Sequence, residues 1–168
     1  LEVGVGRGTV SRQLWERFPG LRFWGIDLSL GMLRRCQSKL RKFATHQGAR
    51  ALCRGDALSL PFPDAAIDSV LNCYLLDLLE EADIGRALAE FGRVLRPGGR
   101  LITASMGEPV VGWRELWNWA YRWNPQLVGG CRSGSAARYF SSTHWRMEHQ
   151  ETVSQMGFRS EVTLAVRR

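Results

Sequence analysis

Apolar runs and amphipathic segments alternate along the first two thirds of the chain. Short apolar runs bounded by turn residues predict strands, whereas an apolar residue at every third or fourth position predicts a helix. The predicted strands cover residues 1–5, 21–26, 49–53, 67–71 and 100–105, and the predicted helices cover 9–18, 29–45 and 80–95. Strands separated by helices predict an α/β fold with a parallel sheet covered on both faces.

The final third of the chain has a different pattern. Residues 144–154 and 161–168 alternate between apolar and polar side chains, which predicts a closing antiparallel hairpin. In this interpretation Trp145, Met147, His149 and Val153 share one face of their strand. A helix over 147–156 that ends at Gly157 is the alternative, and a further helix is predicted over 111–121.

Glycine occupies every second position after the first predicted strand, at Gly4, Gly6 and Gly8. Glycine lets the backbone bend into the next helix and lets a ligand touch the main chain. Asp27 and Asp56 follow the second and third predicted strands. Ligands of open α/β sheets bind where the carboxyl ends of the strands meet, so we expect these residues to form one site. Turn formation or helix capping is the alternative role of each aspartate.

The glycine spacing differs from that of dinucleotide-binding loops. The G-x-G-x-x-G pattern counted from Gly4 requires glycine at position 9, which is Thr9. The chain instead reads E-x-G-x-G-x-G from Glu2 and has no lysine in the loop. A nicotinamide-dependent oxidoreductase is therefore disfavoured.

Four segments together resemble the class I S-adenosylmethionine-dependent methyltransferases of the type 11 group. These segments are "LEVGVGRG", "GIDLS", "GDALSLPFPDAAIDSV" and "FGRVLRPGGRL", and the resemblance is strong over residues 1–106. It implies a Rossmann-like, doubly wound sheet of seven strands, mostly parallel, in one domain over residues 1–168. The cofactor half is expected over 1–106 and the acceptor half over 107–168, and the family's N-terminal helices are expected to be missing.

The resemblance also implies S-adenosyl-L-methionine as the cofactor and a set of residues that contact it. By analogy the glycine loop lies against the methionine part, Asp27 holds the ribose hydroxyls and Asp56 accepts a hydrogen bond from the adenine amine. The implied cofactor-binding residues are Glu2, Gly4, Gly6, Gly8, Asp27, Leu28, Asp56, Ala57 and Asn72. Glu2 either supports the loop or contacts the cofactor. No metal is expected.

The acceptor and the catalytic residues are less defined. Tyr74 and His144 are the catalytic candidates, with strand-end packing and a surface position as the alternatives, and Glu108 and Glu115 are weighed beside them. Residues 116–140 loosely resemble an insert of quinone-biosynthesis C-methyltransferases. The Trp-rich segment 113–123 is interpreted as the wall of an apolar acceptor pocket, as helix packing or as an interfacial helix for peripheral membrane contact.

Charge and cysteine content narrow the classes of partner and metal site that the protein could have. The net charge is +7, but the basic residues are scattered, so a nucleic-acid partner is not expected. The four cysteines form no C-x-x-C pair, which disfavours zinc and is compatible with a cytoplasmic protein. The sequence therefore predicts methyl transfer to a small, apolar or aromatic acceptor, with a catalytically silent binding module as the alternative.

Overall fold

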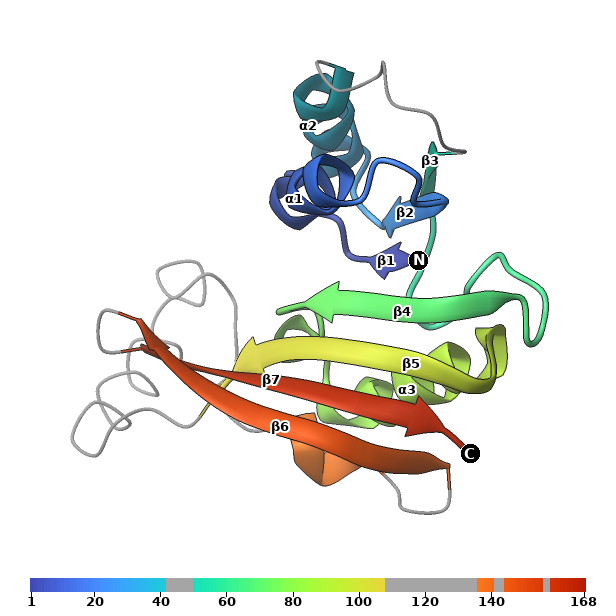
Figure 1. The fold of residues 1–168 in the computed structure, drawn as a ribbon, viewed down its shortest axis with the longest axis vertical. Coiled ribbons are helices and arrows are strands. Elements are labelled where there is room, and N and C mark those ends of the chain that lie inside the picture. The colour runs from blue at the N-terminus through green and yellow to red at the C-terminus, as the bar shows by residue number, and fades with distance from the viewer. Residues whose placement is uncertain (42–49, 108–135, 141–143, 156–157) are drawn as a thin grey trace.

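A single seven-stranded sheet organises the computed structural model, which describes residues 1–41, 50–107, 136–140, 144–155 and 158–168 (Figure 1). The strands are β1 (Glu2–Val3), β2 (Phe23–Asp27), β3 (Arg50–Arg54), β4 (Ile67–Cys73), β5 (Leu95–Met106), β6 (Trp145–Gln155) and β7 (Phe158–Arg167). Their order across the sheet is β3-β2-β1-β4-β5-β7-β6. The first five are parallel, and β7 is antiparallel to both β5 and β6.

Three α-helices and two short 3₁₀ helices are described. They are α1 (Thr9–Arg17), α2 (Leu30–Leu40), α3 (Glu81–Val94), η2 (Leu76–Leu78) and η4 (Ala136–Tyr139). Within the described residues, no helix is both long enough and apolar enough to span a bilayer. The predicted α/β fold with a mostly parallel seven-stranded sheet and a C-terminal hairpin is confirmed, whereas the helix predicted over 111–121 lies outside the described residues.

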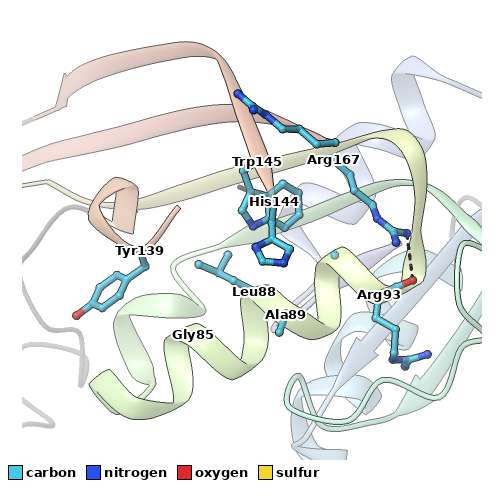
Figure 2. Close-up of a pocket in the computed structure, with 10 residues that line it drawn as sticks. Gly85, Leu88, Ala89, Arg93, Tyr139, His144, Trp145 and Arg167 are labelled. Atoms are coloured by element: carbon cyan, nitrogen blue, oxygen red, sulfur yellow. Dashed lines mark hydrogen bonds between the residues drawn. The ribbon is translucent and has the colours of Figure 1, made fainter. Parts of the chain in front are cut away.

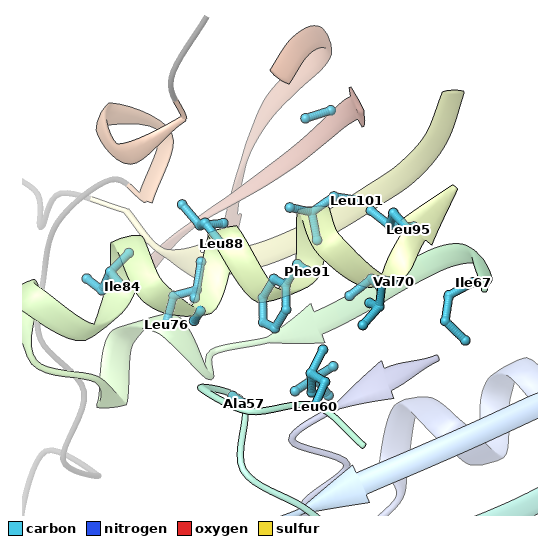
Figure 3. Close-up of a cluster of buried hydrophobic side chains, with 14 of the residues drawn as sticks. Ala57, Leu60, Ile67, Val70, Leu76, Ile84, Leu88, Phe91, Leu95 and Leu101 are labelled. Atoms are coloured by element: carbon cyan, nitrogen blue, oxygen red, sulfur yellow. The ribbon is translucent and has the colours of Figure 1, made fainter. Parts of the chain in front are cut away.

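The two faces of the sheet bury separate apolar cores. Phe23 and Ile26 are three residues apart on β2, so their side chains point to opposite faces. Phe23 packs with Trp15 of α1 and Leu33 of α2 in one cluster. Ile26 belongs to the other cluster, which holds Phe91 of α3 (Figure 3). Helices on both faces make the sheet doubly wound and leave its edges to bind ligands.

The hairpin is confirmed, but one detail of its prediction is wrong. The β6–β7 register shifts between Met147 and His149, so that Met147 pairs with Ala165 and His149 pairs with Leu164. Neighbouring residues on β7 point to opposite faces, so Met147 and His149 do as well. A β-bulge at Glu148 therefore moves His149 and Val153 to the face opposite Trp145. Strict alternation in the sequence cannot reveal an inserted residue.

Arg93, near the end of α3, holds the loop that follows β3 by hydrogen bonds and ion pairs. Its guanidinium donates to the carbonyl oxygens of Leu60 at 3.0 Å and Phe62 at 2.8 Å. It also pairs with Glu90 and Asp64, at 2.8 Å and 2.7 Å. Glu90 in turn accepts a hydrogen bond from the Leu60 amide at 2.8 Å. These contacts fix the loop that begins with Gly55 and Asp56 relative to the sheet.

Candidate functional site

The turn between β1 and α1 has three glycines in the left-handed region. Gly4, Gly6 and Gly8 have φ angles of 77°, 52° and 71°. L-amino acids with a side chain adopt this conformation only at a cost, so the turn requires glycine at alternate positions. The Gly4 and Val5 amides donate to the Ile26 carbonyl oxygen at 2.8 Å and 3.0 Å, which attaches the turn to β2.

The three glycines differ in what a side chain at each position would meet. A Cβ on Gly8 would lie 2.6 Å from the Cys36 Sγ, and a Cβ on Gly4 would lie 3.2 Å from Leu75. Both of these glycines therefore permit close packing inside the protein. A Cβ on Gly6 would meet no atom within 4 Å. Gly6 is thus the position of the turn where bare main chain faces open space, as a ligand cradle requires.

The Asp27 side chain is turned toward this loop. Its Oδ2 accepts a hydrogen bond from the Gly6 amide at 2.8 Å, and its Oδ1 accepts one from the Ser29 amide at 2.8 Å. A carboxylate has about four lone-pair positions, so each oxygen retains capacity for a further donor. Ser29 also caps α2 through its hydroxyl, which accepts from the Met32 amide at 3.3 Å.

Asp56 lies beside Asp27 at the carboxyl edge of the sheet. The Gly55 amide donates to the Asp27 carbonyl oxygen at 3.2 Å, which joins the two strand ends. Asp56 is exposed, and its Oδ1 accepts a hydrogen bond from the Leu58 amide at 2.9 Å. Ala57 is buried beneath it, whereas Leu28 is 62% exposed next to Asp27. The structure therefore brings these predicted residues to one edge.

Glu2 lies behind the loop, inside the protein. It is 3% exposed, and its Oε2 accepts a hydrogen bond from the Ser11 hydroxyl at 2.5 Å. Burial raises the pKa of Glu2 to about 7, and the Ser11 hydrogen bond opposes that rise. Glu2 therefore supports the start of α1 from within and is not part of an exposed surface.

Comparison with known protein families shows to which family the chain belongs. Residues 1–99 match the family described as "Methyltransferase domain". The chain belongs to this methyltransferase domain family. The match spans the glycine loop, both aspartates and α3, so the family predicted from the sequence is confirmed.

Individual relatives agree with the family. A demethylmenaquinone methyltransferase of Thermus thermophilus is 35% identical over 144 residues, which cover 83% of this chain and 61% of the relative. The chain spans between 45% and 61% of the length of the first three curated relatives that it matches.

Solved structures share the fold at low sequence identity. Magnesium protoporphyrin IX methyltransferase from Synechocystis, solved with bound SAH, is 16% identical with a TM-score of 0.77, covering 99% of this chain and 73% of that chain. The [4+2]-cyclase SpnF is 19% identical with a TM-score of 0.73, and the match covers 99% of this chain and 73% of SpnF. The same architecture thus carries more than one reaction.

Two predicted residues of the methyltransferase domain are not exposed beside Gly6 and Asp27: one is buried and the other lies at the opposite edge of the sheet. Asn72 is 0% exposed on the sheet face that α3 covers, and neither polar atom of its side chain has a hydrogen-bond partner among the described residues. His144 precedes the first residue of β6, which runs parallel to β5. It therefore lies at the opposite, amino-terminal edge of the sheet, and the structure does not bring it to Gly6 and Asp27.

Tyr74 does lie at the carboxyl edge, directly after β4. Its φ of 59° is unusual for a residue with a side chain. The Tyr74 amide donates to the Ala104 carbonyl oxygen at 2.6 Å, and its hydroxyl lies 2.8 Å from the Ser160 Oγ. Strained backbone is frequent at functional sites, because the surrounding structure must hold it in place.

Asp77 is a buried acid that sequence reasoning missed. It is 5% exposed in η2, and its Oδ2 accepts a hydrogen bond from the Met106 amide at 2.9 Å, at the end of β5. Burial raises the pKa of Asp77 to about 7, against the effect of this hydrogen bond. The only signal was a single acid within the apolar stretch "LLDLL". Glu108, Glu115 and the Trp-rich segment lie outside the described residues.

Proposed function

We propose that the protein binds S-adenosylmethionine and transfers its methyl group to a small, apolar or aromatic acceptor. The observation that carries the proposal is the pairing of Gly6 with Asp27. Gly6 presents bare main chain to open space, and the Asp27 carboxylate is fixed beside it by two backbone amides. The family match and the similarity to an enzyme solved with bound SAH support the choice of cofactor.

Each residue of the edge has a defined role in this proposal. The Asp27 oxygens keep lone pairs for two neighbouring ribose hydroxyls, and hydrogen bonds to a charged acceptor are the stronger kind. Asp56, with Ala57 beneath it, offers an acceptor for the adenine amine, while Leu28 offers exposed apolar surface to the ring. The loop contains Arg7 and no lysine, which fits a ligand that has no phosphate at this turn.

S-adenosylmethionine held at Gly6, Asp27 and Asp56 would supply a methyl carbon that is electrophilic because it is attached to a positively charged sulfur, and the sulfur would keep the electron pair of the carbon–sulfur bond when the acceptor atom takes the methyl group. The protein's main task is alignment, and orientation of this kind is worth about 7–11 kcal/mol. Tyr74 lies directly after β4, at the same edge of the sheet, and we assign it no proton-transfer role.

The name of a relative supports the proposed acceptor class. A protein that is 35% identical over 144 residues is named a demethylmenaquinone methyltransferase. We therefore propose a small molecule rather than a nucleic acid as the acceptor. The scattered distribution of basic residues agrees with this choice.

Ligand-dependent thermal unfolding tests the proposal. S-adenosylhomocysteine should stabilise the protein by RT ln(1 + [L]/Kd), which is about 2.7 kcal/mol at one hundred times Kd. NAD at the same concentration should give no comparable shift. Asp27→Ala should remove most of the response, because it removes the fixed carboxylate beside Gly6.

Asp68→Ala is the matched control, because Asp68 is an exposed acid on β4 outside the proposed site. A larger response to NAD, or an Asp27→Ala variant that responds like wild type, would contradict the cofactor assignment. Binding of S-adenosylhomocysteine without methylation of any tested quinol or phenol would favour a silent binding module or another reaction on the same fold.

A further inference from the structure

A second candidate site lies along α3, away from the glycine loop. It is a pocket of about 490 Å³ between α3, the start of β6 and the end of β7 (Figure 2). Pockets of this size hold small organic molecules. Trp145 is the first residue of β6 and pairs with Arg167 near the end of β7, so this part of the pocket lies at the amino-terminal edge of the sheet. The carboxyl edge with Gly6 and Asp27 is at the other end of the strands.

The inner wall of the pocket is apolar and aromatic. Leu88 of α3 and Trp145 are 3% and 4% exposed and supply its buried part, and Tyr139 lines it from η4. Aromatic walls bind flat apolar groups through both burial and ring stacking. The pocket is therefore suited to a ligand with an aromatic or other apolar body.

Small residues of α3 keep the pocket open. Gly85, Ala89 and Gly92 line it with Leu88, at helical spacing on one face of α3. A Cβ on Gly85 would meet no atom within 4 Å, and a Cβ on Gly92 would make an ordinary 3.5 Å contact with Trp145. Packing thus does not require glycine at either position, although glycine weakens a helix interior. Larger side chains at these positions would fill the pocket.

The polar lining is basic. Arg93, His144, Arg167 and Arg168 line the pocket, and no aspartate or glutamate does. The charge of Arg93 is balanced by Glu90 and Asp64. Arg167 donates to the carbonyl oxygens of Leu95 and Arg93 at the end of α3. Among the described residues, no carboxylate pairs with the guanidinium of Arg167 or Arg168.

We propose that this pocket binds a small organic anion, with an aromatic or apolar body against Leu88 and Trp145 and a phosphate or carboxylate beside Arg167 and Arg168. Arginine matches the geometry of both anionic groups and stacks on aromatic rings. The site is separate from the proposed cofactor site, because none of its lining residues belongs to the glycine loop or to the strand ends that carry Asp27 and Asp56. Its occupancy therefore does not depend on the proposed methyl transfer.

Titration calorimetry with phenyl phosphate at fixed ionic strength tests the proposal. The protein should bind one equivalent, and inorganic phosphate and phenol should each bind at least about tenfold more weakly, because each lacks one half of the recognition. Arg168→Gln should weaken phenyl phosphate about tenfold. Gly85→Leu should abolish saturable binding by filling the pocket.

Matched variants separate specific binding from general effects of charge or folding. Ala82→Leu places the same side chain on an exposed position of α3 outside the pocket, and Arg34→Gln removes one exposed charge from α2. Both should bind phenyl phosphate like wild type, and all four variants should retain the wild-type response to S-adenosylhomocysteine. Undiminished binding in Gly85→Leu, or equal binding of inorganic phosphate, would overturn the proposal.

Discussion

The glycine loop and the pocket along α3 are built in different ways. The loop is defined by its main chain: three glycines at alternate positions of one turn have positive φ, and two backbone amides fix the Asp27 carboxylate. At the pocket, the main chain is an ordinary helix beside ordinary strands. Its character comes from side chains, namely two aromatic walls, small residues of α3 and arginines.

This difference predicts different responses to mutation. A site made from backbone conformation is lost when a side chain is added at a glycine, because the whole turn is strained. Substitution of a side chain on a regular element leaves the fold stable even where it alters the pocket, because only the local contact changes. Substitutions at Gly8, Glu2 and Gly85 test this contrast, in order of decreasing effect on stability.

Gly8→Ala should produce the largest loss. The new Cβ would lie 2.6 Å from the Cys36 Sγ, and alanine would have to adopt a φ of 71°. Backbone strain and overpacking together should lower the free energy of unfolding by about 2–5 kcal/mol. Urea denaturation measures this loss, and no change would contradict the account of the turn.

Cys36→Ala separates the two causes in the same experiment. Removing Sγ relieves the closest contact but leaves the backbone strain, so the double variant should recover only part of the loss. Complete recovery would show that the left-handed conformation at Gly8 costs little. The phenyl phosphate titration should be unaffected in whichever of these variants folds.

Glu2→Gln should have an intermediate effect that depends on pH. Burial raises the pKa of Glu2 to about 7, so between about pH 4.5 and 7 the folded protein holds a proton that the unfolded chain releases. The contribution of Glu2 to stability therefore falls as the pH rises through this range. Glutamine cannot ionise, so the variant should gain ~1–3 kcal/mol relative to wild type between pH 5 and pH 8.

Denaturant unfolding at the two pH values measures this gain. Asp77→Asn is an instructive companion, because burial raises the pKa of Asp77 to about 7 as well and the same sign applies. A Glu16→Gln variant is the control, because Glu16 is exposed on α1 and pairs with Arg12. If the free energy of unfolding of Glu2→Gln varied with pH in parallel with that of wild type, Glu2 would not have the raised pKa that its burial predicts.

Gly85→Ala should have the smallest effect, and its sign should be opposite to that of Gly8→Ala. Alanine is favoured over glycine in a helix interior, and the added Cβ meets no neighbour. We expect the free energy of unfolding to rise by about 0.5–1 kcal/mol. A loss of stability would show that Gly85 serves packing, which would weaken the argument that it keeps the pocket open.

The element pattern could be predicted because it depends on local properties. Alternation of apolar and polar residues follows from the geometry of strands and helices, so β2 and α3 were predicted within two residues of their observed ends. The bulge at Glu148 could not be predicted in this way. It depends on pairing with β7, and strict alternation contains no sign of it.

The sequence by itself determined the family, the doubly wound sheet and the edge at which Gly6, Asp27 and Asp56 meet, because each follows from strand ends in a parallel sheet. Only the tertiary structure decided which glycine faces a ligand and which faces Cys36 or Leu75. It also decided that His144 joins Arg167 in a pocket far from that edge. The physical reason is that such contacts join residues distant in the chain, and local pattern carries no information about what a side chain meets across the fold.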